Sequence, residues 1–197
     1  MIDVLVLISG TGSNLRALLD AAAQADFPAR IVAVGSDTDA PGFAHAREFG
    51  IPTFVVSPPA FDSRESWGDE LRSLVALWNP DLVVCAGFMR ILPANFVRAF
   101  APHIINVHPA LLPLFPGAHA VRDALAAGVH ETGSTVHVVD EGVDTGPIID
   151  QVRVAVDARD TEESLHEKIK QIERPLLVDT VVSIAHGHID LKELVAQ

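Results

Sequence analysis

Val-Leu-Val-Leu-Ile-Ser-Gly-Thr-Gly-Ser-Asn, residues 4–14, is the stretch of sequence that decides the fold. An apolar run from Asp3 to Ile8 has the length and composition of a buried strand, and a glycine-containing turn follows it at once. A helix with regularly spaced leucines then begins near Ser13. Strand, tight turn and helix in this order predict the first unit of a parallel α/β sheet.

The same alternation continues along the chain. It predicts further strands at 30–35, 53–56, 81–86 and 103–107, separated by helices at 42–50, 62–78 and from Pro93. After a helix at 119–127, two strands at 133–139 and 147–156 are so close in sequence that we expect them to pair antiparallel at the sheet edge. A last helix at 161–186 has a capping sequence at its start, and we expect Pro175 to kink it. The prediction is therefore a doubly wound, mostly parallel sheet with an antiparallel edge.

Length and composition indicate one packed domain, residues 1–197. Of these residues 49% are hydrophobic and 20% are charged, which is typical of a globular protein. A net charge of −12 repels nucleic acids and anionic membranes. The apolar runs are too short to span a bilayer and the first residues lack the features of an export signal, so we expect a cytoplasmic protein without membrane or nucleic-acid partners. The single cysteine, Cys85, lies in an apolar strand and is interpreted as a buried thiol.

The turn at residues 9–14 is a candidate anion site. Glycines allow a tight turn, and the free N–H groups at the start of a helix attract a negative charge. Leu15 stands where a dinucleotide-binding fingerprint has its third glycine, and no lysine follows Gly12 as in a nucleoside-triphosphate loop. Ser13 and Asn14 add side-chain donors, which favours a single phosphate group. A purely structural turn is the alternative.

Asn106 and His108 are candidates for catalysis at the end of the strand 103–107. They alternate with Val107, so both side chains project from one face of the strand. An amide that donates a hydrogen bond and an imidazole that carries a proton near neutral pH suit a reaction with a developing oxyanion, such as acyl transfer to an amine. Asp144, in the polar loop 140–146, could orient His108 and favour its charged form, whereas the alternative is an ordinary surface turn.

Other chemistries find less support in the sequence. The nine histidines include no His-Glu-x-x-His motif and no Cys/His cluster with metal-ligand spacing, so we expect no metal. A Gly-x-Ser-x-Gly motif, typical of serine hydrolases, is lacking as well.

The motifs together resemble the folate-dependent phosphoribosylglycinamide formyltransferases of purine biosynthesis. The resemblance runs from Val4 to about Glu173, and seven segments in the same order carry it: Leu-Ile-Ser-Gly-Thr-Gly-Ser-Asn (7–14), Phe-Asp-Ser-Arg-Glu (61–65), Ala-Gly-Phe-Met-Arg-Ile-Leu (86–92), Asn-Val-His-Pro-Ala-Leu-Leu-Pro (106–113), Phe-Pro-Gly (115–117), Gly-Ser-Thr-Val-His (133–137) and Asp-Thr-Gly-Pro-Ile (144–148).

This resemblance implies that the chain transfers the formyl group of 10-formyltetrahydrofolate to the amine of 5-phosphoribosylglycinamide. Asn106, His108 and Asp144 would be the catalytic residues. The phosphate and ribose would contact Gly12, Ser13, Asn14, Lys170 and Glu173. The folate would contact Arg64, Met89, Arg90, Ile91, Leu92, Asn106, Asp140, Glu141, Gly142, Val143 and Asp144. The resemblance divides the domain into a phosphate-binding half (about 1–100) and a folate-binding and catalytic half (about 101–190).

Two positions depart from the family pattern, and other functions remain open. Ala110 stands where relatives often have serine, and Leu114 where some have lysine; both flank the expected site. The alternatives are another formyl-folate enzyme (a formyl-folate hydrolase or methionyl-tRNA formyltransferase) and a phosphoribosyl-binding module without catalysis. The strand at 147–156 is a candidate contact for a homodimer through its free edge.

Overall fold

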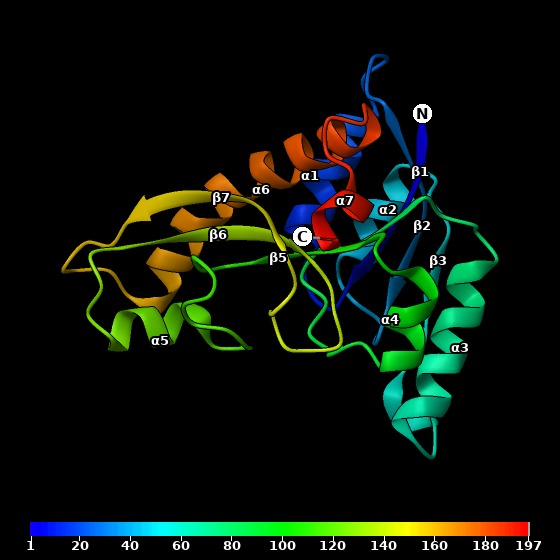
Figure 1. The fold of residues 1–197 in the computed structure, drawn as a ribbon, viewed down its shortest axis with the longest axis horizontal. Coiled ribbons are helices and arrows are strands. Elements are labelled where there is room, and N and C mark those ends of the chain that lie inside the picture. Colours follow the sequence, from blue (N-terminus) through cyan, green and yellow to red (C-terminus); the bar gives the residue numbers. More distant parts are fainter. Residues whose placement is uncertain (197) are drawn as a thin grey trace.

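A single seven-stranded sheet runs through the computed structural model, which describes residues 1–196 (Figure 1). The strand order is β3-β2-β1-β4-β5-β6-β7; the first five strands are parallel, and β6 and β7 are antiparallel to their neighbours. This confirms the predicted doubly wound sheet with an antiparallel edge. The strands are β1 (Ile2–Ile8), β2 (Ala29–Ser36), β3 (Thr53–Val55), β4 (Leu82–Cys85), β5 (Ile104–His108), β6 (Glu131–Val138) and β7 (Ile148–Ala155).

The helices lie close to their predicted positions. They are α1 (Ser13–Ala22), α2 (Phe43–Glu48), α3 (Arg64–Ala76), α4 (Ala94–Phe100), α5 (Ala120–Ala126), α6 (Glu162–Ala185) and α7 (Leu191–Val195), with a 3-10 turn η1 at Pro58–Ala60.

Capping side chains determine where several helices begin. At the start of α3 the hydroxyl of Ser63 accepts from the Ser66 N–H, and the hydroxyl of Ser66 accepts from the Ser63 N–H. Thr161 and Ser164 form the same reciprocal pair of hydrogen bonds at the start of α6. Helix α6 stays helical through Pro175 over 24 residues. Asp190 caps α7, a short helix that was not predicted from the sequence.

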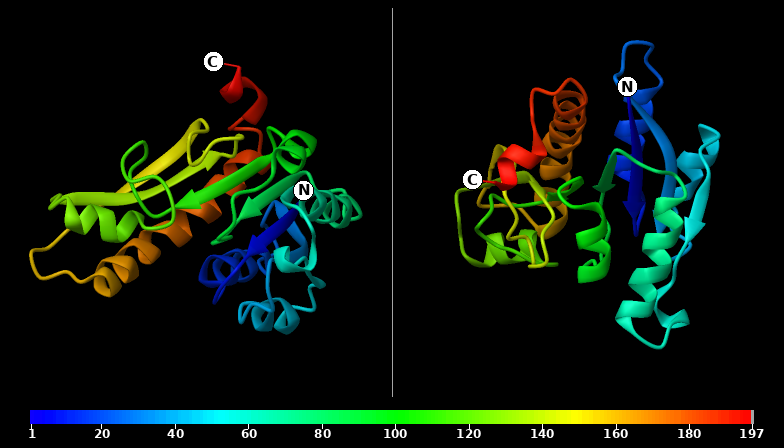
Figure 2. Two further views of the ribbon diagram at one scale, coloured as in Figure 1. Left: turned by 90° about the horizontal axis from the view of Figure 1, so that it is seen from below. Right: turned by 45° about the vertical axis from the view of Figure 1, so that its right-hand side comes forward.

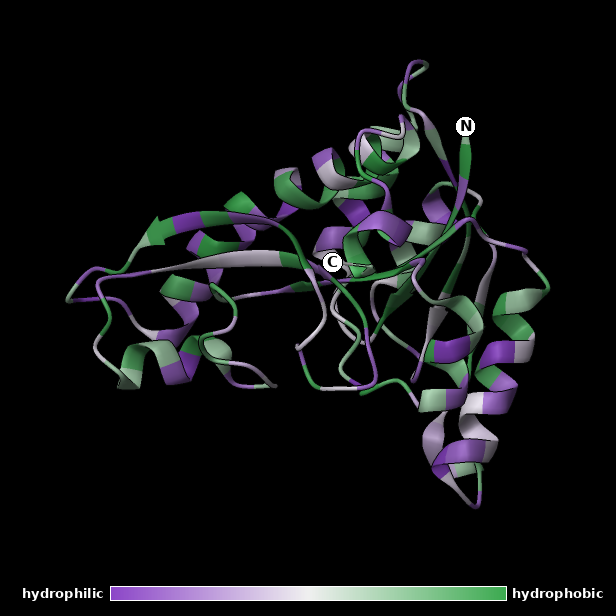
Figure 3. Cartoon of the chain, in the orientation of Figure 1, coloured by the Kyte–Doolittle hydropathy of each residue, from purple (hydrophilic) through white to green (hydrophobic). Residues whose placement is uncertain are grey.

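Helices cover both faces of the sheet (Figure 2). Helices α1 and α6 pack on one face, where buried residues such as Leu18 and Leu177 meet Val4 and Val6 of β1. Helices α3 and α4 pack on the other face against Leu5 of β1 and its neighbours. Successive residues of β1 therefore serve opposite cores, which explains why that strand is apolar throughout. Figure 3 shows the corresponding pattern in the helices, which carry alternating hydrophobic and hydrophilic bands.

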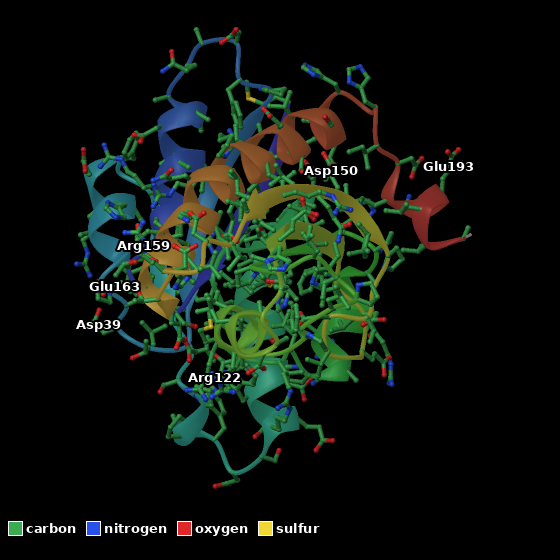
Figure 4. The ribbon with its side chains drawn as sticks, turned by 90° about the vertical axis from the view of Figure 1, so that its left-hand side faces the viewer. Asp39, Arg122, Asp150, Arg159, Glu163 and Glu193 are labelled. Atoms are coloured by element: carbon green, nitrogen blue, oxygen red, sulfur yellow. The ribbon has the colours of Figure 1, made fainter. Side chains whose placement is uncertain are left out.

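Charged side chains gather on the outside of the molecule. Figure 4 labels six of them, and all six are exposed: Asp39, Arg122, Asp150, Arg159, Glu163 and Glu193. Among the described residues, no helix combines the length and the hydrophobicity that crossing a membrane requires.

The strand order places a crevice between β1 and β4. The chain leaves β1 in the direction of β2 and leaves β4 in the direction of β5, so the turns after these two strands diverge at their carboxyl ends. The turn after β1 contains Gly10 and Gly12 and leads into α1 at Ser13, and the turn after β4 contains Gly87 to Leu92. Hydrogen bonds join the two turns directly: Ser9 N–H donates to the Gly87 carbonyl (3.0 Å), and Met89 N–H donates to Ser9 Oγ (2.8 Å).

Candidate active site

Asn106, His108 and Asp144 lie together at the carboxyl end of β5. Asn106 and His108 are on one face of β5, and the loop after β6 folds back so that Asp144 reaches both of the buried histidines there. The distance from His108 Nδ1 to Asp144 Oδ2 is 3.4 Å, and that from His137 Nε2 to Asp144 Oδ1 is 3.5 Å. The structure thus brings together side chains that are 38 residues apart in sequence (106 to 144).

The Asp144 carboxyl is ionised at neutral pH. Burial by itself raises its pKa, but the neighbouring His137 ring, the Gly117 N–H at 2.7 Å and the charge of His108 outweigh this effect and lower the pKa to about 2. The backbone of Asp144 has a left-handed conformation with φ of 55°. This conformation turns the loop so that the carboxylate faces His108 instead of solvent.

Both ring nitrogens of His108 have partners. Nε2 is 2.8 Å from the carbonyl oxygen of Phe115, which only accepts hydrogen bonds, so Nε2 carries a hydrogen. Nδ1 faces the ionised Asp144. An imidazolium, which has a hydrogen on each nitrogen, satisfies both contacts at once.

The loop after β5 is fastened to β6 and β7. Thr135 Oγ1 donates to the Ala110 carbonyl (2.6 Å) and accepts from the Leu112 N–H (3.1 Å). Gln151 of β7 donates to both the Leu112 carbonyl and Thr135 Oγ1. Phe115, beyond this anchor, has a left-handed backbone with φ of 55°. The anchored loop therefore presents the Phe115 carbonyl to His108.

A cleft of about 250 Å³ opens beside these residues. Its lining residues come from four segments, within 85–92, 106–109, 117–118 and 137–144. Most of the residues predicted to bind folate line it, namely Met89, Arg90, Ile91, Leu92, Asn106, Asp140, Gly142, Val143 and Asp144. Met89, Ile91 and Val143 are exposed apolar side chains at this opening, and such a slot suits a flat, largely apolar ring.

Two of the predicted folate residues lie outside the cleft lining. Arg64 donates to the carbonyl of Ile91 from the start of α3, and Glu141 pairs with Arg98 of α4 (2.6 Å). These contacts support the two loops from behind: Arg64 braces the loop after β4, and Arg98 braces the loop 140–146. Inside the latter loop, Asp140 accepts from Gly142 N–H and Thr145 Oγ1. Arg90 extends from the cleft to the buried carboxylate of Asp37 (2.6 Å).

The residues predicted to bind the phosphate and ribose lie where α1 meets α6. Gly12 has a left-handed backbone (φ of 74°), and the first turn of α1 has neither a side-chain cap nor an acidic residue. Asn14 is buried, and its amide donates to Glu173 of α6 (2.7 Å). Lys170, one turn earlier on α6, pairs with Glu167 (2.7 Å). The sequence predicts that the Asn14 side chain faces the phosphate, whereas in the ligand-free structure it points toward Glu173.

Glu173 is a buried carboxylate held from two sides. Asn14 donates to Oε1, and Ser134 Oγ of β6 donates to Oε2 (2.9 Å). Ser134 Oγ also lies 3.2 Å from the carbonyl oxygen of His108. Buried polar groups need such partners to offset their loss of hydration. Glu173 therefore connects the start of α1 with the strand pair that carries the candidate catalytic residues.

Sequence reasoning missed His137 and Ser134. Both lie in the segment 133–137, one of the seven segments that carry the family resemblance. A polar residue in a buried strand next to the loop 140–146 was the available signal. Their partners could not be assigned, because the pairing of β6 with β5 is not written in the sequence.

Cys85 is a buried thiol on β4, as expected. Burial raises its pKa to about 12, so the thiol stays protonated at neutral pH and is a poor nucleophile. Within residues 1–196, no three His, Cys, Asp or Glu side chains are grouped so that they could hold a metal ion.

Comparison with known proteins gives one consistent result. Residues 2–181 match the model of the formyl transferase family. Phosphoribosylglycinamide formyltransferase of Mycobacterium tuberculosis (strain CDC 1551 / Oshkosh) is 52% identical over 185 residues, which cover 93% of this chain and 86% of that protein. The trifunctional purine biosynthetic protein adenosine-3 of Drosophila melanogaster is 45% identical over 187 residues, which cover 93% of this chain and 14% of that protein.

A solved structure agrees with these relatives. The crystal structure of glycinamide ribonucleotide transformylase 1 from Symbiobacterium toebii superimposes with a TM-score of 0.92 at 41% identity, over 95% of this chain and 89% of that one.

Proposed function

The chain belongs to the formyl transferase family, and we propose that it transfers the formyl group of 10-formyltetrahydrofolate to the amine of 5-phosphoribosylglycinamide in purine biosynthesis. The products are formylglycinamide ribonucleotide and tetrahydrofolate. One observation carries the proposal: Asn106, His108 and Asp144 meet beside an apolar cleft, next to the uncapped start of α1. A formyl donor and a phosphorylated amine would meet at this junction.

The two ligands would occupy opposite sides of the crevice. The pterin ring of the donor fits the slot between residues 87–92 and the loop 140–144, and the phosphate of the acceptor fits the free N–H groups at the start of α1. Glu173, held between two donors, would accept from the ribose hydroxyls, and Lys170 would exchange Glu167 for the phosphate. A local site of this kind allows an acidic protein to bind an anionic substrate.

The reaction joins the acceptor amine to the formyl carbon and breaks the bond between that carbon and the folate nitrogen. As the amine attacks, the formyl oxygen becomes negative, and Asn106 donates a hydrogen bond to it while the charged His108 stabilises it. The leaving folate nitrogen takes a proton from His108, and the proton released by the attacking amine restores the balance. Asp144 keeps His108 oriented and charged.

The hydrogen on His108 Nε2 is bound to the Phe115 carbonyl in the ligand-free protein. Because Asp144 faces Nδ1, Nε2 is the nitrogen that would deliver the proton. Formyl transfer therefore requires His108 to exchange the Phe115 carbonyl for the folate nitrogen. The loop carrying Phe115 would shift when both ligands are bound.

A coupled assay tests the proposal. Purified protein is mixed with 10-formyltetrahydrofolate and glycinamide ribonucleotide, and tetrahydrofolate and the formylated product are both measured. We expect equal amounts of the two products, and neither product when the acceptor is omitted. Tetrahydrofolate and formate released without acceptor would favour a hydrolase, and binding of both ligands without turnover would favour a non-catalytic module. Fractionation of the source cells tests the expected cytoplasmic location.

A further inference from the structure

His137 faces Asn106 across two antiparallel strands. The register pairs Asn106 of β5 directly with His137 of β6, so the two side chains project from the same face of the sheet. His137 is only 2% exposed, and both residues line the cleft. A register shift in the β6–β7 pairing falls between Val136 and His137, and irregularities of this kind redirect side chains next to active sites.

The backbone determines which ring nitrogen of His137 carries the hydrogen. Nδ1 lies 2.9 Å from the carbonyl oxygen of Val138. A carbonyl oxygen only accepts, so Nδ1 must donate and must carry a hydrogen. In a neutral imidazole the other nitrogen then has a lone pair and acts as an acceptor. Nε2 of neutral His137 is therefore an acceptor that points toward β5.

Asn106 supplies the donor for that acceptor. Its amide nitrogen Nδ2 lies 3.1 Å from His137 Nε2, a normal hydrogen-bond length. If the amide were turned over, the Asn106 oxygen would face the lone pair of Nε2, and two acceptors would repel each other. Neutral His137 therefore selects one of the two orientations of the Asn106 amide.

We propose that His137 is a positioning residue that holds the Asn106 amide with its N–H end available to the reacting formyl oxygen. This inference rests on the proposed function. One amide hydrogen binds His137, and the second remains for the oxyanion. An amide free to rotate would spend part of its time with its own oxygen near the developing negative charge. In that orientation the oxyanion would lose its hydrogen bond and would be repelled by the amide oxygen.

A charged His137 would reverse this arrangement. Its Nε2 would carry a hydrogen, would repel the Asn106 N–H and would reach Asp144 Oδ1, 3.5 Å away. The amide would then turn its oxygen toward His137 and withdraw its N–H from the cleft. The other titratable side chains of the cleft are His108, Asp140, Arg90 and Cys85. The Asn106 contact (3.1 Å) is shorter than the Asp144 contact (3.5 Å), so we assign the neutral ring to the ligand-free protein. With no hydrogen on His137 Nε2, the Gly117 N–H and His108 are the groups left to hold the Asp144 pKa low.

Nitrogen NMR of the wild-type protein tests the tautomer without any assay of activity. The protein is labelled with nitrogen-15 in its histidine rings, and the His137 signals are assigned by their loss in His137→Gln. We expect a neutral ring at pH 7 with hydrogen on Nδ1 and none on Nε2. A hydrogen on Nε2, in a neutral or a charged ring, would overturn the proposal.

Kinetics test whether His137 acts through Asn106. His137→Leu fills the space without an acceptor, whereas His137→Gln keeps a side-chain oxygen that can accept from Asn106. We expect His137→Leu to lower kcat by up to about 10²–10³, the range for losing one oxyanion donor, with much smaller changes in both KM values. His137→Gln should recover most of kcat. Equal losses in the two variants would contradict a role as acceptor.

A double variant completes the experiment. In an Asn106→Ala background there is no amide to orient, so adding His137→Leu should lower kcat little further. Losses that multiply would mean that His137 acts independently of Asn106, and would overturn the inference. Absence of formyl transfer by the wild-type protein would instead count against the proposed function and would leave the NMR result to decide the tautomer.

Discussion

Asp144 combines a proposed catalytic role with an unusual backbone conformation. Asparagine is the most informative replacement, because it keeps the size of the side chain and tolerates the left-handed φ of 55°. We expect Asp144→Asn to fold normally and to lose most of kcat, since an amide cannot hold the charged form of His108. Circular dichroism and the coupled assay check the two parts. Turnover like that of the wild type would exclude the role given to Asp144.

The Asp144 carboxyl should also make the free energy of unfolding depend on pH. Its pKa is lowered from 3.8 to about 2 on folding, so it stabilises the protein above about pH 4 and loses this effect as the pH falls toward 2. The shift corresponds to about 2 kcal/mol. The free energy of unfolding of the wild type minus that of Asp144→Asn should therefore shrink by about this amount between about pH 5 and pH 2. A difference that stays constant over this range would contradict the lowered pKa.

At the level of single residues, part of the candidate site could be predicted from the sequence and part could not. The alternation of Asn106 and His108 was visible, but the alignment of Asp144 depends on a left-handed turn that no pattern in the loop specifies. Ala110 departs from the family pattern, but it acts here through its backbone. Its carbonyl accepts a hydrogen bond from Thr135 Oγ1, and this contact does not depend on the side chain at position 110. Leu114, the second departure, is 56% exposed and lies outside the cleft lining.

At the scale of elements, the turn between β1 and α1 makes different demands on its two glycines. A Cβ on Gly12 would lie 3.0 Å from the Gly42 backbone and would force a side chain into the left-handed region, whereas a Cβ on Gly10 would meet nothing within 4 Å. We expect Gly12→Ala to destabilise the protein by about 1–2 kcal/mol and to raise KM for the phosphorylated acceptor. Gly10→Ala is the matched control and should change stability little. Urea unfolding and acceptor titration would show whether the two variants differ.

The Ser134 hydroxyl links β6 to α6 through Glu173. Ser134→Ala removes one of the two donors to a buried carboxylate and should cost about 1–3 kcal/mol of unfolding free energy. It should also raise KM for the acceptor more than KM for the folate, because we propose that Glu173 binds the acceptor ribose. Ser73→Ala serves as control, since Ser73 donates only to the Asp69 carbonyl within the exposed surface of α3. Equal effects of the two changes would refute the special position of Ser134.

The elements themselves were largely predictable. Strands buried on both faces read as continuous apolar runs, and the capping sequences at Ser63 and Thr161 marked helix starts within a residue or two. Helix α7 was missed because five residues carry too little periodicity to show a helix. The positions of Arg64 and Glu141 behind the cleft were also beyond sequence reasoning, since each depends on a partner from another element.

At the scale of the whole molecule, stability should be highest in the centre of the sheet. Strands β1 and β4 are flanked on both sides and buried on both faces, whereas β3 and β7 are edge strands with more exposed residues. We expect amide hydrogens of β1 and β4 to exchange only through global unfolding, and those of β7 to exchange sooner through local opening. Hydrogen exchange followed by mass spectrometry would detect this order. Faster exchange in β1 than in β7 would contradict it.

Among the residues that the structure describes, strand β7 lies at the end of the sheet and has one unpaired edge. A homodimer that forms through this edge therefore stays a prediction. Sedimentation velocity over a range of concentrations tests it, and a monomer at every concentration would remove it.

The sequence predicts the class of the sheet but not the order of its strands. Alternating strands and helices indicate a parallel sheet. The pairing of β1 with β4, in contrast, depends on packing among segments that are distant in sequence.

The division of the crevice has a consequence for how such a protein can change over time. The proposed acceptor side is built from α1 and α6, near the two ends of the chain, whereas the proposed donor side and reacting groups come from the middle, residues 85–144. Substitutions in the outer segments can therefore alter which amine is recognised while formyl chemistry is inherited intact. The hydrogen bond between Ser134 and Glu173 joins the two sides. A change of acceptor during evolution would therefore have to alter or replace this contact first.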